Sequence, residues 1–509
     1  MAFVRSGNRK HQAGHSVRVR HVLRSGLLCV FLLGLGVGAA AASPWAEVGD
    51  TGLRSDIEIL ATARMVDGIT SQWPISWRGL YASLNKDDGA LDLQPDYVAI
   101  AERHVRQMAR VQTSTGFQTT ASLDLTNLPS LIRDFGALGR QDAQAQLSMQ
   151  YNMDTTSIRL NVGAQTGNRY DHQTLMLDGS YIAQLVGNSI VYAGYMPHWW
   201  GPGWMSALSL SNNARPFPHV GIMRADTSAF QWPVLRWLGP WQAEFFVGAL
   251  DGPRINRNTL YDAVRISFNP FPGLEIGFAR MDEMCGTGQP CKPLAEWLHF
   301  SNNSKVANQT NDQGLIDIHY TGRVGAVPFS IYVQEMNEVQ SNPLPQSVSH
   351  LYGATVWSPY RRGLARFTLE WASSIPTYQL FWGHIDHGFA YNNIQYPDGL
   401  RYRDRSLGFS LDSDSQLFSI VGDWRSPNGI DYRLSLQHAD VSNPYIGLTR
   451  PSFYNIVTTS PVRINMVEGR VSFPFHRMMV DLAVRAQDDQ PRPDHGFNAA
   501  AEIRLRSML

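Results

Sequence analysis

The sequence predicts an all-β barrel that crosses a membrane, preceded by a short helical region. From about residue 116 onward, apolar residues recur at every second position over about 390 residues, the period of strands with one apolar and one polar face. Short turns alternate with long stretches rich in Asn, Asp, Gly and Tyr, as in barrels that carry short turns at one end and long loops at the other. At about 20 residues per strand and loop, this length allows roughly 16 to 20 strands.

Residues 1–42 have the three parts of a secretory signal peptide. Six basic residues and no acidic residue precede a short apolar run, Leu27–Leu33, which fades through glycines into Ala39–Ala42. A basic start, a short apolar core and small residues before the cut define such signals, so we expect cleavage after Ala42. The alternative is a membrane-spanning helix, but the apolar run of about 16 residues is shorter than the roughly 20 that a span needs.

The balanced charge of the whole chain, 43 basic against 43 acidic residues, depends on this segment. Without residues 1–42 the chain has 37 basic and 43 acidic side chains, a net charge of −6. Nucleic-acid-binding proteins normally have a basic surplus, so no nucleic-acid partner is expected. An acidic polymer would have to bind at local basic clusters, because the chain as a whole would repel it.

Residues 43–115 are expected to form a small helical bundle. Apolar residues recur with helical spacing in Leu53–Ala61 and again in Val98–Met108, which places each set on one helix face. Gly68 is a plausible end for the first helix, and Pro95 stands just inside the start of the next. A shorter helix is expected at Trp77–Leu84. These helices are amphipathic and of modest length, which is typical of a bundle and not of a membrane span.

Residues 116–509 are expected to form the barrel. The clearest alternating segments are Ala143–Tyr151, Ile158–Ala164, Val264–Phe268, Leu274–Phe278, Ile316–Tyr320, Phe329–Val333, Tyr432–Leu436, Val480–Ala486 and Phe497–Leu509. A soluble β-sandwich would alternate in the same way. Polar positions rich in Gln, Asn, Ser and Arg, and an unbroken series of strands, favour the membrane barrel. Membrane barrels often end on an aromatic residue. This chain ends on Leu509, which is an argument against the membrane barrel.

Cys285 and Cys291 are separated by five residues in a stretch that also contains Gly286, Gly288 and Pro290. In an exported protein a pair this close is expected to form a disulfide. A metal site is the weaker alternative, because no second pair of ligands lies nearby. His384 and His387 do not suggest a metal site either, since positions three apart on a strand face opposite sides.

Three parts of the chain carry more than a strand pattern. They are Ser43–Ile57 with Trp73–Pro74 and Trp77; Trp199–Trp204 followed by Leu208–Pro216; and Gly399–Gly408 followed by Asp412–Asp414. Taken together and in this order, they resemble the Wzi-type capsule-assembly family of outer-membrane proteins, most specifically in the tryptophan-rich segment and the Ser211–Pro216 run. The resemblance covers nearly all of residues 43–509. It implies an outer-membrane barrel of about 18 strands with the helical bundle at its periplasmic end.

The resemblance also implies a non-enzymatic, lectin-like role that attaches or organises capsular polysaccharide or exopolysaccharide at the surface of a Gram-negative cell. It implies no catalytic residues, no metal and no cofactor. The expected partners are the capsular or extracellular polysaccharide, outer-membrane lipid and the polysaccharide export machinery. We expect the chain to act as a monomer.

Sugars offer hydroxyl groups to hydrogen bonds and apolar C–H faces to aromatic rings. The candidate polysaccharide-binding residues are His198, Trp199, Trp200, Trp204, Asn212, Asn213 and Arg215 in the tryptophan-rich segment, then Tyr391, Asn392, Asn393, Tyr396, Arg401, Arg403 and Arg405. Residues 297–303 form another candidate loop. The alternative is that these residues have an architectural role and do not contact sugar. The tryptophans would brace the Gly201–Gly203 turn, and arginines aligned on one strand face would pair with Asp412 and Asp414 and close the lumen.

Two other functions remain open. One is a saccharide channel or porin of the outer membrane, which requires an open lumen. The other is a membrane-embedded hydrolase or acyltransferase, which requires a Ser/His/acid cluster that no spacing in the sequence assembles. The sequence contains no G-x-S-x-G, H-E-x-x-H or Walker motif, so an enzyme is not expected.

Overall fold

The structure is a computed structural model that describes residues 44–85, 94–166, 171–294, 297, 309–339, 346–379, 382–448, 450–491 and 496–508. Residues 41–509 form one structural unit. The predicted signal peptide, residues 1–42, lies outside the described residues.

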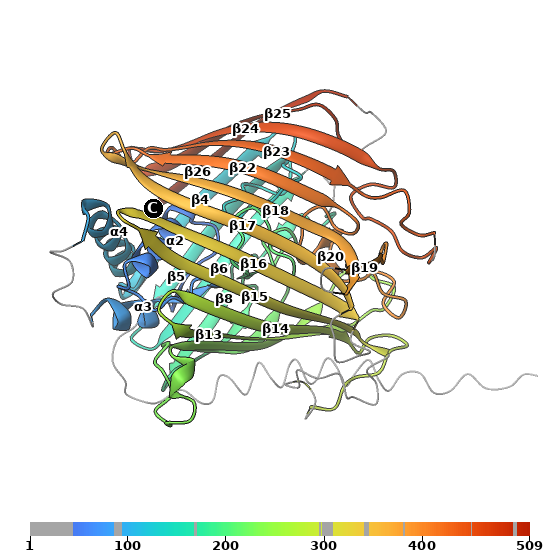
Figure 1. The fold of residues 1–509 in the computed structure, drawn as a ribbon, viewed down its shortest axis with the longest axis horizontal. Coiled ribbons are helices and arrows are strands. Elements are labelled where there is room, and N and C mark those ends of the chain that lie inside the picture. The colour runs from blue at the N-terminus through green and yellow to red at the C-terminus, as the bar shows by residue number, and fades with distance from the viewer. Residues whose placement is uncertain are drawn as a thin grey trace, which may run out of the picture. The chain divides into compact units, whose positions relative to one another are not determined.

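The strands close into an antiparallel barrel (Figure 1). In chain order they are β4 (Gly116–Thr126), β5 (Ala143–Asn152), β6 (Thr156–Thr166), β7 (Leu175–Met176), β8 (Tyr181–Val186), β9 (Ser189–Gly194), β11 (His219–Arg224), β12 (Trp241–Leu250), β13 (Thr259–Phe271), β14 (Leu274–Met284), β15 (Asn311–Val324), β16 (Val327–Val339), β17 (Gln346–Tyr360), β18 (Gly363–Gln379), β19 (Trp382–Ile385), β22 (Gln416–Arg425), β23 (Asp431–Val441), β24 (Val462–Phe475), β25 (Met478–Gln487) and β26 (Asn498–Met508).

The barrel closes where β26 pairs with β4, the last strand with the first. Strand β6 pairs directly with β8, and β18 pairs directly with β22, so the short β7 and β19 lie beside the ring. In the part of the chain that the structure describes, the circuit therefore passes through 18 strands. The predicted fold class is confirmed.

The apolar faces of the strands point outward and are not covered by a second sheet. On β5 and β6, Leu147, Tyr151 and Leu160 are 39–49% exposed, whereas Gln144 and Gln165, which face the lumen, are buried and hydrogen-bonded to each other. A sandwich would bury its apolar faces. The exposed apolar faces are those of a barrel surrounded by lipid.

Exposed aromatic residues mark the strand ends next to the short turns. They are Phe117, Tyr151, Phe271, Tyr360, Tyr432 and Phe475. Aromatic rings are enriched at the boundary between lipid and water, where an amphipathic ring satisfies both environments. This row therefore marks one edge of the lipid-facing band.

The N-terminal helices lie at the end of the barrel that carries the short turns (Figure 1). They are α2 (Thr51–Thr62), α3 (Trp77–Leu84) and α4 (Asp96–Gln112), with Pro95 as the N-cap of α4. The Tyr97 hydroxyl donates to the carbonyl of Ala326 in the β15–β16 turn at 2.8 Å. No described helix has the length and apolarity of a membrane span.

The first helix ends earlier than predicted, at Thr62 and not near Gly68. Arg64 adopts a left-handed conformation with φ 64°, and the Met65 N–H donates back to the carbonyl of Leu60 at 2.9 Å. Such a left-handed residue satisfies the last carbonyls of a helix without glycine. The sequence gives little sign of this end, because arginine rarely occupies that position.

Four segments outside the ring fold into the lumen: residues 44–85, 127–142, 195–218 and 386–415. Strand β10 (Trp199–Trp200) pairs with β2 (Gln72–Trp73), and β1 (Trp45–Ala46) pairs with β3 (Ile75–Ser76). In the fourth segment, β20 (Arg401–Tyr402) pairs with β21 (Arg405–Ser406). These luminal segments give the barrel a continuous buried core, which includes Trp45, Trp73, Trp77, Trp199 and Trp200.

Candidate functional site

The two groups of candidate residues come together inside the barrel. The Tyr391 hydroxyl donates to the Leu208 carbonyl at 2.5 Å, and the Asn213 amide donates to the Ser406 carbonyl at 2.9 Å. Arg405 in turn donates to the Asn213 side-chain oxygen at 3.1 Å. Segments 195–218 and 386–415, distant in sequence, therefore form one assembly.

The three tryptophans of this assembly are almost fully buried, with at most 2% of each exposed. The Trp199 indole donates to the Gly203 carbonyl at 3.0 Å, within the turn that it braces. The Trp204 ring lies between two guanidinium groups, 4.1 Å from that of Arg54 and 3.5 Å from that of Arg366. Because protein groups occupy the ring faces, this geometry supports the architectural alternative.

A buried carboxylate fixes the backbone of the same turn. Glu370, which points inward from β18, accepts the Trp204 N–H at 2.7 Å and the Met205 N–H at 3.2 Å. Arg54 donates to the carbonyls of Pro202 at 2.6 Å and Gly203 at 2.9 Å. Arg54 and Glu370 escaped notice in the sequence because each is an isolated charge far from the turn.

The polar candidates of the tryptophan-rich segment also have internal partners. His198 lies 3.0 Å from Glu244, and the Asn212 amide donates to the Asp134 carbonyl at 2.8 Å. Arg215 forms ion pairs with Asp171 at 2.7 Å and with Asp178 at 2.8 Å. These side chains hold loops together, and direct sugar contact by them stays a prediction.

The predicted arginine strand is a hairpin instead, so the three arginines do not share one strand face. Arg403 and Asp404 adopt left-handed conformations, with φ 51° and 58°, and form the two-residue turn between β20 and β21. Arg401 is buried and forms a bidentate pair with Asp412 at 2.7 and 2.9 Å. Asp414 accepts from His387 and from the Gly388 N–H, and pairs with no arginine among the residues that the structure describes. The proposed pairing thus holds for Arg401 with Asp412.

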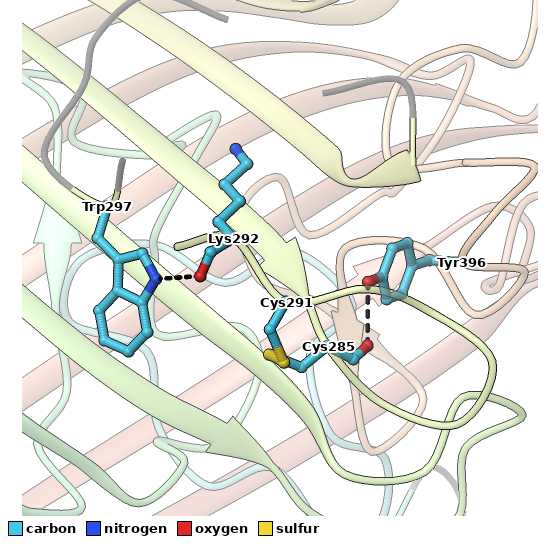
Figure 2. Close-up of a disulfide and its surroundings, with 5 residues drawn as sticks. All are labelled: Cys285, Cys291, Lys292, Trp297 and Tyr396. Atoms are coloured by element: carbon cyan, nitrogen blue, oxygen red, sulfur yellow. Dashed lines mark hydrogen bonds between the residues drawn. A yellow bond between two sulfur atoms is a disulfide. The ribbon is translucent and has the colours of Figure 1, made fainter. Parts of the chain in front are cut away.

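The Tyr391–Tyr396 loop is similarly anchored. The Tyr391 N–H donates to Glu338 at 2.8 Å, and the Asn392 amide donates to the Gly388 carbonyl at 2.8 Å. The Asn393 amide donates to Asn311 at 3.1 Å. The Tyr396 hydroxyl donates to the Cys285 carbonyl at 3.0 Å (Figure 2).

Cys285 and Cys291 are joined by a disulfide (Figure 2). The next residue, Lys292, is buried and pairs with Asp282 and, at 2.7 Å, with Asp312. The Trp297 indole donates to the Lys292 carbonyl at 3.0 Å, and the rest of the candidate loop 297–303 lies outside the described residues. The described residues hold no group of three His, Cys, Asp or Glu arranged for a metal; His384 pairs with Asp386 at 3.0 Å.

The tip of the hairpin is one of the less buried parts of the assembly, although only 11% of the Arg403 side chain is exposed. Arg403 lies 3.5 Å from Asp171 and 3.5 Å from Asp251, and the Tyr402 hydroxyl donates to Asp251. Asp404 is exposed, and partial burial of its carboxyl raises its pKa. We call Asp171, Asp251, Arg403 and Asp404 the tip cluster. A guanidinium beside several carboxylates offers both donors and acceptors to a hydroxyl-rich ligand.

Sequence reasoning identified Arg403, with Asp404 in the same run, but missed Asp171 and Asp251. Asp171 and Asp251 lie on loops 80 residues apart in the sequence, and neither stands in a local motif. Only the closure of the barrel brings them to the hairpin, so no spacing rule reveals them.

The chain was compared with known proteins. The family model described as "Capsule assembly protein Wzi" matches residues 112–487. A Klebsiella pneumoniae protein described as an uncharacterized 55.8 kDa protein in the cps region is 24% identical over 323 residues, which are 62% of this chain and 63% of that protein. The match therefore spans less than two thirds of that relative.

One solved structure shows the same fold. Wzi of Escherichia coli, described as an outer-membrane protein involved in group 1 capsule assembly and a carbohydrate-binding β-barrel, aligns with a TM-score of 0.77 and 18% identity over 92% of this chain and 99% of that one. OprD of Pseudomonas aeruginosa aligns with a TM-score of 0.44 and 8% identity over 77% of this chain and 94% of that one.

Proposed function

The chain belongs to the Wzi capsule assembly family, and we propose from this that it holds or organises a capsular or related surface polysaccharide on the outer membrane. The observation that carries the proposal is the filled lumen. Luminal segments cross the barrel interior and leave a polar hairpin tip at the end that carries the long loops. A barrel built in this way presents a rigid binding surface.

We place polysaccharide contact at the tip cluster and the loops around it. Arg403 has charged donors, and the exposed Asp251 and Asp404 are acceptors for sugar hydroxyls. Asp171 is buried and pairs with Arg215 and Arg403. The arginine also suits a uronate or another acidic sugar, through charge-assisted hydrogen bonds. Because residues 43–509 have a net charge of −6, such a polymer has to be recognised at a local cation.

The remaining parts of the proposal follow from the sequence. Residues 1–42 act as the export signal, residues 43–115 as the helical bundle at the periplasmic end, and residues 116–509 as the barrel. The chain works as a monomer without catalysis, and the helical end faces the polysaccharide export machinery. The described helices α2, α3 and α4 and the short turns between strands lie at this same end of the barrel (Figure 1).

A saccharide channel is the alternative function. Ion pairs bridge the luminal segments and the wall, including Asp56 with Arg425 of β22 at 2.8 Å and Asp134 with Arg433 of β23. Moving such buried pairs aside would expose unpaired charges at a large free-energy cost. Purified protein in a planar bilayer should therefore give no steady conductance, and open-channel currents would favour transport.

The decisive experiment measures binding of the purified full chain to the polysaccharide of its own host and to an unrelated polysaccharide. Selective binding supports the proposal. A deletion strain should still make polymer but release it into the medium. Normal retention of polymer on the surface of that strain would overturn the proposed role.

A further inference from the structure

A groove runs across the outer face of the barrel wall on β17, β18, β22 and β23. It has a volume of about 460 Å³ and an apolar lining. Its floor consists of three small residues that face outward on adjacent strands, Ser358, Ala365 and Gly422. A Cβ added at Gly422 would meet no atom within 4 Å, so the missing side chain hollows the wall.

Large apolar side chains form the rim of this groove. Phe367 pairs across the strands with Val356 on one side and Gly422 on the other, and Gly422 pairs with Leu434. Phe367 is 49% exposed and Leu434 is 55% exposed. The groove thus lies within the lipid-facing band, where its natural occupant is an acyl chain.

Three aromatic rings close the end of the groove next to the short turns. The rings of Trp424 and Tyr432 stack with centroids 5.3 Å apart, and Tyr360 lies edge-on to Trp424 at 6.2 Å. The Trp424 indole donates to the Tyr360 carbonyl at 3.2 Å. Such rings mark the level of lipid headgroups.

Two arginines stand at this end of the groove, in the two-residue turn between β17 and β18. Arg361 lies 5.3 Å from the centroid of the Tyr360 ring. Both Arg361 and Arg362 are exposed, and among the described residues neither forms an ion pair with a carboxylate. An acyl groove therefore ends at two cationic groups without an anionic partner in the described chain.

The backbone of this turn adds an independent observation. Arg361 and Arg362 have φ values of 48° and 63°, both in the left-handed region. Asn-Gly is the favoured pair in such a turn, because these residues enter that region at little cost. Arginine at both positions is conformationally unfavourable, and such local strain is concentrated at functional sites.

We propose that this groove binds one anionic phospholipid of the periplasmic leaflet. An acyl chain lies over Gly422 between Phe367 and Leu434, and the phosphate pairs with Arg361 and Arg362. Basic side chains beside an acyl site select anionic headgroups over zwitterionic ones. The bound lipid would fix the depth of this wall in the membrane, a role separate from polysaccharide binding.

A second groove on the same wall provides a control. It has a volume of about 490 Å³, includes Ala354, Leu369 and Trp371 in its lining, and has no basic residue in that lining. The lining of the first groove includes Arg366 and Arg433, but both pair with Asp423, and Arg361 and Arg362 lie beyond its Tyr360 end. It should accept acyl chains without a headgroup preference. Arg477, in the β24–β25 turn, is a control for charge loss at another short turn.

The test is native mass spectrometry of the purified full chain, with equal amounts of phosphatidylglycerol and phosphatidylcholine added to the detergent. The wild type should retain phosphatidylglycerol about tenfold better, as two arginines near an anionic headgroup permit. Arg361→Asn with Arg362→Gly keeps the turn favourable and should abolish the preference, whereas Arg477→Asn should keep it. Gly422→Leu should reduce phosphatidylglycerol retention, whereas Ala354→Leu should not.

Equal retention of the two lipids by the wild type, an unchanged preference in the double variant, or an equal loss in Arg477→Asn would overturn the proposal. Heat modifiability on gels verifies that each variant is a folded barrel. Because no step involves sugar, failure here leaves the proposed polysaccharide role untouched.

Discussion

Asp56 on α2 connects two elements that the chain places far apart. One of its carboxylate oxygens lies 2.5 Å from His104 Nδ1 on α4 and accepts a hydrogen bond from Arg425 on β22 at 2.8 Å. Burial opposes the charge of Asp56, but Arg425 and His104 outweigh it and lower the pKa of this carboxyl. The hydrogen bond to Asp56 raises the pKa of His104. One carboxylate therefore links α2, α4 and the barrel wall.

This arrangement predicts a pH-dependent attachment of α4. Because the folded-state pKa of His104 is raised, its stabilising contribution is complete below the ordinary value of about 6.5 and is lost as pH rises through the raised value. Hydrogen exchange of α4 should therefore become faster at mildly alkaline pH. The His104→Asn variant should show a smaller pH dependence, and an identical profile in both proteins would contradict this role.

Protonation of the Asp56 carboxylate predicts a second loss of stability, at acidic pH. The pKa of Asp56 is lowered, so its contribution is present above the ordinary value near 4 and disappears as pH falls through the folded-state value. Asp56→Ala would leave the Arg425 charge with fewer partners, and we expect about 3 kcal/mol lower stability. Denaturant unfolding at neutral pH measures this difference. Asp440→Ala, which removes an exposed partner of Arg463, should change stability little.

The alternation of apolar and polar residues predicted the strands well. Each strand of a barrel wall faces lipid on one side and the lumen on the other, so its side chains alternate with a period of two residues. The segments around Leu147, Ile318 and Leu434 all lie on strands with the predicted faces. Pro95 likewise marked the start of α4. These features depend on local sequence and on a choice between lipid and lumen, and both are visible in a single chain.

The luminal segments were far less predictable. The hairpin at Arg403 and Asp404 uses left-handed residues other than glycine or asparagine, so the usual turn signal is missing. The partners of Trp204 come from two distant elements, Arg54 from α2 and both Arg366 and Glu370 from β18. Only the closed barrel brings them together, and a sequence period carries no information about such contacts.

Glu370 should be the most sensitive position beneath the tryptophan turn. Its carboxylate accepts the backbone N–H groups of Trp204 and Met205 and also the Tyr332 hydroxyl at 2.9 Å. Glu370→Ala would leave these buried donors without partners, each at a cost of about 1–3 kcal/mol. We expect a lower denaturation midpoint and faster proteolysis of residues 195–218. Unchanged unfolding would show that water replaces the carboxylate.

The disulfide should act on its loop and not on the barrel as a whole. Cys285→Ser with Cys291→Ser opens a loop of only six residues' separation, for which chain entropy predicts a cost of about 2 kcal/mol. Limited proteolysis should cleave the double variant near residues 286–297, while β14 and β15 stay protected. Cleavage at equal rates with and without the bond would contradict this local role.

Substitutions in the tip cluster and in the buried Arg401–Asp412 pair should have opposite effects on polymer binding and on stability. Arg403→Gln changes a side chain that is 11% exposed at the hairpin tip and should weaken binding to the host polysaccharide about tenfold, because it removes a charge-assisted contact. Its ion pairs with Asp171 and Asp251 are long, at 3.5 Å, so stability should change little. Arg401→Gln breaks the buried pair with Asp412 and should lower stability by about 3 kcal/mol. In the fraction that still folds, the Arg401 variant should bind polymer normally. Polymer binding on immobilised protein, measured beside denaturant unfolding, separates the two effects. Loss of binding in the Arg401 variant alone would move the recognition site away from the hairpin tip and into the luminal assembly.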